Sequence, residues 1–414
     1  MKIFKNIIVK IFPIKTREWF RNIIFKHFRN LGLLKYLTLF KLLTCNKYIH
    51  INHSTVDNFL ESNHSMIKAS KFLETDKIKQ ANYIFGDLES TIQPFTATTE
   101  TVILEISDLT FSFRNNHLLD KNLNIIGETR TSKLENILPL YIYKQFLPYT
   151  VHFEGTVAYL SDPDPLNYYH WMCRVLPLLK FYKQNFQLFD IDYFYIGQFP
   201  LSNFHKETLE AAGIPFSRII QTACTADKLV IAITNRSLDL GNQINDPINK
   251  ESYLFTRNLF SHKLQHSSQS EKRRLYIKRG SVSRRKLINE IEVIQLLEQY
   301  GFESVVMDNK TVQEQAELFF KAEVVVALHG AALTNLLFIE PGTKVIELAP
   351  FGYINNCFYT LSSHAKADYF YLQGEKLNQE DADLRSLNTC IDIQKLSSLL
   401  QKAALNEIKT KYLV

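Results

Sequence analysis

The segment Val324–Asn335 constrains the fold more than any other part of the chain. It opens with five consecutive apolar residues, three of them β-branched (Val324–Leu328), which is typical of a strand covered on both faces in a parallel sheet. The small residues of His329–Ala332 follow and leave space for another molecule near the backbone. A predicted helix comes next, and its free N–H groups and positive dipole end attract anions. The segment therefore predicts an anion site, with a tight structural turn around a buried His as the alternative.

Strand-like and helical patterns alternate from about residue 168 onward, which predicts an α/β fold. Strands are expected at 193–197, 228–232, 274–278, 303–307, 324–328, 344–348 and 368–372. Helices are expected at 170–184, 206–212, 289–300, 311–321 and 333–338, with a Thr311–Glu314 capping box and a Gly301 cap. Residues 50–160 predict short mixed strands, and the polar stretch 262–272 predicts a linker.

Four polar side chains stand at or near the ends of the predicted parallel strands. They are Arg279, Asp308, His329 and Glu347. Ligands of such sheets bind outside the carboxyl ends of the strands, so these side chains are expected to line one edge.

The loop after the 274–278 strand is strongly basic, with five cations among residues 278–286. Arginine suits a diphosphate because its planar guanidinium donates two hydrogen bonds at once. Since this loop leaves the same edge as His329, Arg279, Arg284 and Arg285 are candidates for holding a pyrophosphate. The alternative is a solvated basic loop.

A third candidate segment runs from Asn167 to Pro177 and opens a predicted helix with His170 and Trp171. A His at a helix start can act as a neutral base or as a hydrogen-bond donor. The alternative is an aromatic helix start that packs on the core. Upstream, Asp162 and Asp164 flank a proline, a pattern more typical of a turn than of a divalent-metal site, and no Cys/His metal spacing occurs.

The charge of the chain is uneven. The whole chain carries a net +6 and residues 1–50 carry +10, so the remainder carries −4, which argues against a broad nucleic-acid footprint. Residues 31–45 are too short and too charged for a membrane span, so a helix lying on an anionic membrane surface is one interpretation of 1–45. An ordinary pair of packed helices is the other. Five scattered cysteines favour a reduced, cytoplasmic protein.

Three segments together resemble glycosyltransferase family 61. They are Asn167-Tyr-Tyr-His-Trp with Leu176-Pro177; Arg274-Leu-Tyr-Ile-Lys-Arg279 with Arg284-Arg285 and Asn289-Glu290; and Val324 to Asn335 with Pro341-Gly-Thr and Glu347. The resemblance covers roughly residues 150–375. It implies two Rossmann-like domains facing a cleft (GT-B), with the nucleotide sugar held mainly by the C-terminal one. It also implies inverting transfer without an essential metal or other cofactor, and bacterial relatives serve capsule and other surface-polysaccharide synthesis.

The resemblance implies roles for individual residues. His170 would be the base or an acceptor contact, Arg279, Arg284 and Arg285 would hold the diphosphate, and Asp308 and Glu347 would contact the nucleoside or ribose. His329, Gly330, Ala331, Thr334 and Asn335 would present donors to phosphate and ribose. The expected domains are a basic segment at 1–50, an acceptor-side α/β domain at 51–265 and a donor domain at 266–414.

One position departs from the family pattern. Many relatives carry an acid four residues after the His, where this chain has Arg174. If that acid orients the His, then Asp162, Asp164 or Glu154 must substitute for it. The leading hypothesis is a transferase that uses a nucleoside-diphosphate sugar and a glycan acceptor, held near the inner membrane face by residues 1–45. The alternative is a catalytically impaired glycan- or nucleotide-binding protein. A dinucleotide-dependent enzyme is disfavoured, because no Gly-x-Gly-x-x-Gly follows a predicted strand.

Overall fold

The computed structural model describes most of residues 48–406. The described ranges are 48–50, 67–78, 83–85, 95–114, 117–120, 125–127, 149–162, 164–185, 190–238, 248–264, 272–280, 285–353, 355–375, 377 and 388–406. All of these residues belong to one compact unit of the chain. The predicted membrane-surface segment 1–45 and the candidate Arg284 lie outside the described residues.

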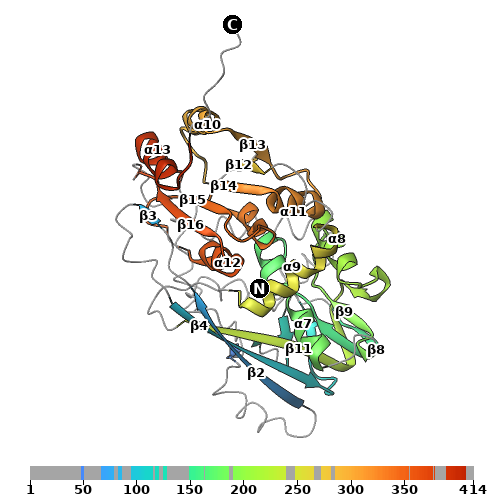
Figure 1. The fold of residues 1–414 in the computed structure, drawn as a ribbon. Coiled ribbons are helices and arrows are strands. Elements are labelled where there is room, and N and C mark those ends of the chain that lie inside the picture. The colour runs from blue at the N-terminus through green and yellow to red at the C-terminus, as the bar shows by residue number, and fades with distance from the viewer. Residues whose placement is uncertain are drawn as a thin grey trace, which may run out of the picture. The chain divides into compact units, whose positions relative to one another are not determined.

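The C-terminal half is built on a six-stranded sheet in which all pairings are parallel (Figure 1). In spatial order its strands are β13 (Phe302–Val306), β12 (Arg273–Lys278), β14 (Ala322–Leu328), β15 (Lys344–Ala349), β16 (Asp368–Gln373) and β3 (Tyr83–Phe85). The strands of the C-terminal half therefore follow the order 2-1-3-4-5, and the direction of winding changes between β12 and β14. In doubly wound sheets, this change of direction opens a crevice at the carboxyl ends of the two strands.

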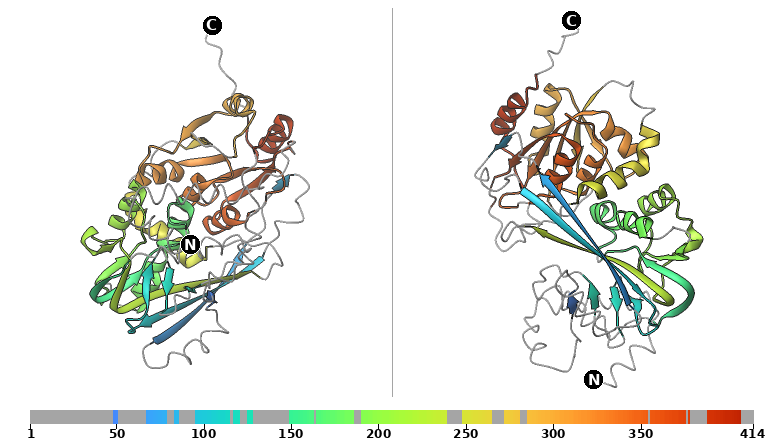
Figure 2. Two further views of the ribbon diagram at one scale, coloured as in Figure 1. Left: turned by 180° about the vertical axis from the view of Figure 1, so that it is seen from behind. Right: turned by 60° about the horizontal axis from the view of Figure 1, so that its bottom comes forward.

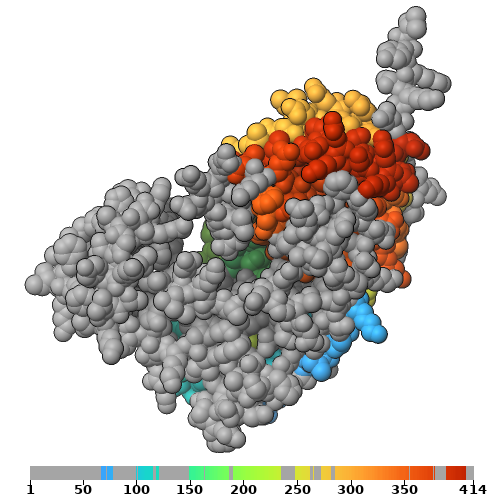
Figure 3. All heavy atoms as spheres, turned by 90° about the vertical axis from the view of Figure 1, so that its left-hand side faces the viewer, coloured from blue at the N-terminus to red at the C-terminus, as the bar shows by residue number. Residues whose placement is uncertain are grey.

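Helices cover both faces of this sheet, which is why its strands read as nearly continuous apolar runs. On one face, α10 (Glu290–Gln299) and α13 (Ile393–Lys402) pack over Tyr276, Val326 and Leu328. These two helices are neighbours, and the gold residues around α10 adjoin the red α13 on the surface in Figure 3. On the other face lie α11 (Val312–Phe320), the 3₁₀ helix η6 (Ala331–Leu337) and α12 (Cys357–Ala365). The strand side chains that alternate with Tyr276, Val326 and Leu328 point toward these three helices.

A second, ten-stranded sheet of mixed direction forms the N-terminal half. Its main order is β1 (Tyr48–His50), β7 (Ile125–Gly127), β6 (His117–Leu119), β5 (Ser112–Arg114), β11 (Cys224–Leu238), β8 (Val151–Tyr159), β9 (Tyr193–Tyr195) and β10 (Ile219–Ile220). The strands β11, β8, β9 and β10 run parallel. The far half of β11 pairs antiparallel with β4 (Phe95–Ile106), which pairs with β2 (Ile67–Ile78), and these form the long ribbon at the right of Figure 2.

The parallel strands of the mixed sheet are connected by helices. Between β8 and β9 the chain forms α6 (Tyr168–His170), the π-helical turn η2 (Trp171–Val175) and α7 (Leu178–Asn185), and α8 (Asn203–Ala211) follows β9. The helix α9 (Lys250–Leu264) then leads into the parallel sheet and contacts η2, α11 and η6. The helix α6 also contacts η6, so the segment that bears His170 lies against the segment that follows β14.

Most of the predicted alternation is confirmed. The seven expected strands and the helices near 206–212, 289–300 and 311–321 are present within a few residues, and both the Thr311–Glu314 capping box and the Gly301 cap are formed. Three predictions need correction. The strands expected at 50–160 are not all short, because β2 and β4 are twelve residues long. The expected linker starts too early, because α9 continues to Leu264, and the expected helix at 170–184 is interrupted by the π-helical turn. The proposed domain boundaries stay a prediction.

Candidate active site

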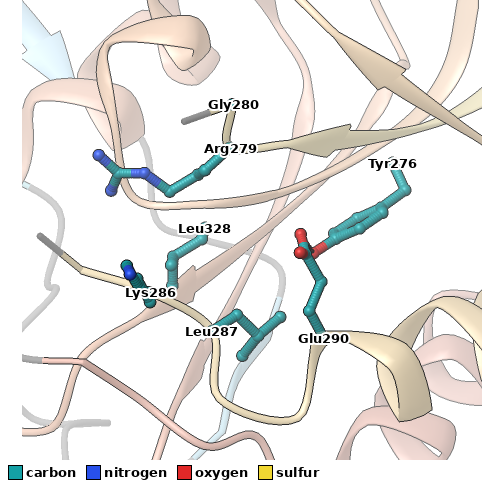
Figure 4. Close-up of a pocket in the computed structure, with 7 residues that line it drawn as sticks. All are labelled: Tyr276, Arg279, Gly280, Lys286, Leu287, Glu290 and Leu328. Carbon is teal, nitrogen blue, oxygen red and sulfur yellow. Dashed lines mark hydrogen bonds between the residues drawn. The ribbon is translucent and has the colours of Figure 1, made fainter. Parts of the chain in front are cut away.

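The structure contains a cavity of about 260 Å³ at the crevice between β12 and β14 (Figure 4). It is lined by Tyr276, Arg279, Gly280, Lys286, Leu287, Glu290 and Leu328. Figure 4 shows the cationic ends of Arg279 and Lys286 on one side, and the Glu290 carboxylate beside Tyr276 on the other. The Tyr276 hydroxyl donates to Glu290 Oε1 at 3.1 Å, which orients the carboxylate. The cavity thus combines two cations, a hydrogen-bond acceptor and apolar walls.

Small residues allow polar groups to approach closely at this edge. A Cβ at Gly280 would overlap the carboxylate of Asp308 in its present position, so the glycine lets Asp308 lie beside the end of β12. A Cβ at Gly330 would lie 3.3 Å from Arg279 Nη1 and would crowd the guanidinium. Arg279 Nη1 instead donates to the carbonyl of His329 at 3.0 Å. The loops after β12 and β14 are therefore held together at the crevice.

Arg285 reaches the same carbonyl from the basic loop. Its Nη1 lies 3.3 Å from the His329 oxygen, and its guanidinium lies 5.9 Å from the centre of the Tyr353 ring. The backbone of Arg285 has φ of 52°, a left-handed conformation that costs a non-glycine residue about 1 kcal/mol or more. This strain accompanies a side chain aimed at the crevice, as is common at functional sites.

The segment from Lys286 to Glu290 is fixed by the chain that precedes α13. The Lys286 amide donates to Asn388 Oδ1, and a β-bridge joins Leu287 to Thr389. The Asn289 side chain both accepts from the Ile391 amide at 3.0 Å and donates to the Ile391 carbonyl at 2.8 Å. These contacts hold the segment Lys286–Glu290, here called the strap, which forms one wall of the cavity.

His329 and Glu347 form a histidine–carboxylate pair inside the protein, here called the buried pair. His329 Nδ1 contacts Glu347 Oε1, while the Tyr369 hydroxyl donates to Glu347 Oε2 at 2.6 Å. Glu347 is 0% exposed, so both carboxylate oxygens are used inside the protein. Burial, followed by the charge of Glu347, raises the pKa of Tyr369 and keeps its hydroxyl protonated as a donor.

The residues after Gly330 form a seven-residue 3₁₀ helix instead of the predicted helical turn at 333–338. Ala331 is exposed, whereas the side chains of Thr334 and Asn335 are fully buried. Asn335 Nδ2 donates to Gln315 Oε1 at 2.7 Å, and its Oδ1 accepts from the Tyr168 hydroxyl at 3.0 Å. Asn335 thus joins η6 to the helix that carries His170.

His170 and Asp162 form a second histidine–carboxylate pair, here called the edge pair. His170 Nδ1 lies 2.8 Å from Asp162 Oδ1, with the two side chains 14% and 10% exposed. Arg174 is close to both, with its Nη1 3.3 Å from His170 Nδ1 and 3.7 Å from Asp162 Oδ2. Among the described residues, none forms a hydrogen bond with His170 Nε2. The edge pair therefore offers one ring nitrogen to a reactant.

The other candidate acids lie differently. Asp164 is exposed, and its amide donates to Asp162 Oδ1 at 2.8 Å in a turn, so it supports Asp162 without contacting His170. Glu154 is exposed near the start of β8, whereas Asp162 follows the carboxyl end of that strand. Of the three acids considered from the sequence, Asp162 is the one that the fold places on His170.

Aromatic rings connect the two pairs. The Tyr169 ring lies 6.3 Å from His170 and 5.8 Å from Phe358, which in turn lies 4.9 Å from His329. The residues predicted for the donor and catalytic roles are thus joined through α6, η6 and α12. The structure places Arg279, Asp308, His329 and Glu347 at one edge of the sheet, although Glu347 points into the interior.

Some cavity residues were missed from the sequence. Tyr276, Lys286 and Glu290 line the cavity but were not among the candidates. Lys286 ends the basic run and Glu290 follows Asn289 in the quoted motif, so both carried a signal. Tyr276 looked like an ordinary strand residue and carried none.

The part of the chain that the structure describes contains no group of three or more His, Cys, Asp or Glu residues arranged for a metal ion. In the same residues, no helix is long and apolar enough to cross a membrane. Cys173, Cys224, Cys357 and Cys390 are free thiols. Burial raises the pKa of Cys224 to about 12, which makes it an unreactive core residue.

The fold and the site define an α/β protein with a cation-lined crevice between β12 and β14, where the winding of the parallel sheet changes direction. Residues 168–346 match the family model described as Glycosyltransferase 61. The match contains the His170 helix, the basic loop and the β14–η6 turn, so this part of the chain is similar to that family. A comparison with curated proteins finds no match to the chain.

Proposed function

We propose that this protein is an inverting, metal-independent glycosyltransferase that moves a sugar from a nucleoside diphosphate to a hydroxyl of a glycan. The observation that carries the proposal is the crevice between β12 and β14, lined by Arg279 and Lys286 and joined through η6 to the helix that bears His170. The family match over residues 168–346 supports the transferase class. The arrangement of both halves as a GT-B pair with a cleft is part of the proposal, supported by the parallel β11-β8-β9-β10 order and the 2-1-3-4-5 order.

In the donor site, Arg279 and Arg285 hold the diphosphate with help from Lys286 and Arg284. Arg279 and Arg285 already converge on the His329 carbonyl, so their guanidinium groups are positioned together. Asp308, exposed at the end of β13, is suited to contact a ribose hydroxyl, as acids at this place do in related sheets. Glu347 is assigned a different role, the orientation of His329, because its oxygens are already used.

In the transfer step, the acceptor hydroxyl oxygen forms a bond to the anomeric carbon as that carbon's bond to the diphosphate oxygen breaks. The hydroxyl proton moves to His170 Nε2, and the nucleoside diphosphate leaves with the bonding electrons and an added negative charge. Asp162 stabilises the imidazolium that results, since its carboxylate lies on Nδ1. Cations fixed at the leaving group stabilise the developing charge before the reaction begins.

The acceptor proposed is a glycan, in one version lipid-linked, in bacterial surface-polysaccharide or capsule synthesis. Residues 1–45 would hold the cytoplasmic protein at the inner face of the plasma membrane through their positive charge. Salt should then release the full-length protein from anionic vesicles but should not affect a chain lacking 1–45. Equal binding of both chains would contradict this part of the proposal.

The defining experiment measures turnover and donor binding over a panel of nucleoside-diphosphate sugars, with and without chelator. The proposal expects cleavage of at least one donor at a rate that chelation leaves unchanged. A rate that falls on chelation and returns with a divalent ion would contradict metal independence.

A second candidate function is binding without transfer. Arg174, 3.3 Å from His170 Nδ1, favours it, because a guanidinium that donates to Nδ1 would leave Nε2 protonated and unable to act as a base. Tight donor binding with no cleavage of any sugar in the panel would favour this candidate.

A further inference from the structure

His170 Nδ1 has two charged neighbours that make opposite demands on it. Asp162 Oδ1 lies at 2.8 Å and can only accept a hydrogen bond while it is ionised, which requires a proton on Nδ1. Arg174 Nη1 lies at 3.3 Å and can only donate, which requires a lone pair on Nδ1. One nitrogen cannot satisfy both, so the balance between these two residues determines which tautomer His170 adopts.

We propose that Asp162 and Arg174 form a tautomer clamp on His170, in which Asp162 holds the proton on Nδ1 and Arg174 holds Asp162 in its charged form. Both are positioning residues, since they act on the reactants only through His170. The inference deepens the proposed function and rests on it for the role of His170 as a base.

The geometry favours Asp162 over Arg174 as the partner of Nδ1. The contact with Asp162 is 0.5 Å shorter than the contact with Arg174, and at 2.8 Å it has the length of a charge-assisted hydrogen bond, whereas the contact with Arg174 at 3.3 Å is longer than such bonds. The carboxylate is oriented from a second side, because its Oδ1 also accepts from the Asp164 amide at 2.8 Å. The proton therefore resides on Nδ1, and the lone pair resides on Nε2.

Arg174 has a separate task, which follows from burial. Asp162 is only 8% exposed, and a buried carboxylate tends to take up a proton unless a positive charge is near. Arg174 Nη1 lies 3.7 Å from Asp162 Oδ2 and supplies that charge. If Asp162 became protonated, it could no longer act as a pure acceptor, and the tautomer of His170 would no longer be fixed.

The backbone that carries Arg174 is itself held in place. The π-helical turn is closed by the hydrogen bond from the Leu176 amide to the Trp171 carbonyl at 3.0 Å. Trp171 is fully buried and donates from Nε1 to Thr208 Oγ1 at 2.7 Å. π-helical turns inside helices are rare and often occur at functional sites. This turn places Arg174, four residues after His170, beside the His170 ring.

The clamp can be tested on the full-length protein without any substrate. Long-range ¹H–¹⁵N spectra of ¹⁵N-histidine-labelled protein report which ring nitrogen carries the proton, with the His170 signals assigned from a His170→Gln sample. We expect the Nδ1–H tautomer in the wild type at pH 8, a mixture of both tautomers in Arg174→Gln, where Asp162 loses its cation, and the Nε2–H tautomer in Asp162→Asn, where Arg174 becomes the charged neighbour of Nδ1. An Nε2–H tautomer in the wild type, or an unchanged tautomer in Asp162→Asn, would overturn the clamp.

The second readout is the turnover number of variants in which the carboxylate is moved from position 162 to position 174. With a donor that the wild type turns over, Asp162→Asn should lower the turnover number by about 100-fold or more, the scale of a lost general base. Asp162→Asn combined with Arg174→Glu places a carboxylate on the other side of Nδ1 and should recover at least about tenfold of that loss. No recovery in a folded double variant that shows the Nδ1–H tautomer would mean that the tautomer does not limit the reaction, which also overturns the inference.

A matched control is available on the surface. His152 and Asp227 form another histidine–aspartate pair, 3.3 Å apart and 44% and 58% exposed, on β8 and β11. Asp227→Asn should leave turnover and the His170 spectrum unchanged. If no nucleotide sugar is turned over, the proposed function fails, while the wild-type and Asp162→Asn spectra still decide whether the clamp exists.

Discussion

The two histidine–carboxylate pairs have similar chemistry and opposite surroundings. In the buried pair, Glu347 is 0% exposed and its second oxygen is taken by Tyr369, so both residues face inward. In the edge pair, Asp162 is buried but His170 is partly exposed, and no described residue forms a hydrogen bond with His170 Nε2. The difference teaches that a histidine–carboxylate pair can hold a turn in place when both residues are buried, whereas a pair with one free ring nitrogen is suited to contact a reactant.

This contrast assigns separate tasks to the pairs. The buried pair lies in the β14–η6 turn, whose His329 carbonyl accepts from Arg279 and Arg285. In the proposed function, this turn positions the donor and the edge pair acts on the acceptor. Variants of the first pair should therefore change stability, and variants of the second should change turnover.

The largest expected effect is on turnover in the edge pair. His170→Gln removes the proposed base, and we expect the turnover number to fall by about 1,000-fold, within the range for general-base catalysis. Donor affinity, measured by calorimetry, should change less than about threefold, because His170 does not touch the diphosphate in this account. A comparable loss of donor affinity would break the division between the pairs.

The next effect is on stability in the buried pair. His329→Gln leaves Glu347 buried without its partner, and we expect the free energy of unfolding to fall by about 3 kcal/mol. Tyr369→Phe removes one hydrogen bond to the same carboxylate and should cost less, about 1 to 2 kcal/mol. Urea denaturation of the three proteins checks the order. Equal stability of His329→Gln and the wild type would show that the pair is not structural.

Arg279→Ala should weaken binding of a nucleoside diphosphate by about 10- to 100-fold, through the loss of charge-assisted hydrogen bonds to phosphate. Arg273→Ala is a matched control at the opposite end of the same strand, where the arginine pairs with the partly exposed Glu303. Calorimetric titration with nucleoside diphosphate separates the two. An unchanged affinity in Arg279→Ala would contradict the assignment of the crevice to the donor.

The smallest effect concerns His205, a fully buried histidine. Its Nε2 bonds the Pro165 carbonyl, in the loop that presents Asp162, and burial lowers the pKa of His205 below its usual value. The unfolded chain therefore binds a proton at higher pH than the folded one. Stability contributed by neutral His205 is complete above about pH 6.5 and is lost as the pH falls below it, by at most about 1.4 kcal/mol per pH unit.

Comparing unfolding free energies at pH 7.5 and 5.5 tests this. His205→Gln should lose less stability on acidification than the wild type. His364, whose pKa burial also lowers, contributes equally to both proteins and cancels in the difference. If the free energy of unfolding fell equally in the two proteins, neutral His205 would not stabilise the loop that contains Pro165.

Much of the parallel sheet could be predicted from the sequence, because its strands are apolar runs separated by helices with clear caps. Thr311 and Glu314 illustrate this, since the capping box was readable three residues apart and is formed. The strap at Lys286–Glu290 could not be predicted, because residues about 100 positions later, Asn388 to Ile391, hold it. The contact of Asp162 with His170 likewise depends on how the loop after β8 folds back onto α6.

The mixed sheet was harder to predict from the sequence than the parallel sheet. The strand β11 is fifteen residues long and changes partners along its length, pairing parallel with β8 and antiparallel with β4. Such a strand faces different environments at its two ends, so no single periodicity describes it. The π-helical turn at 171–175 has no sequence signature either, and its buried Trp171 is held by Thr208 of α8, which lies 37 residues further along the chain.

The most direct test of the central claim is the anomeric configuration of the sugar released from a nucleoside-diphosphate sugar, with water as acceptor, followed by ¹H NMR before mutarotation. The account predicts that, in the presence of chelator, the sugar first appears with the configuration opposite to that in the donor, and that His170→Gln abolishes its release. A released sugar that keeps the donor's configuration, or a His170→Gln protein that releases it as fast as the wild type, would contradict the account.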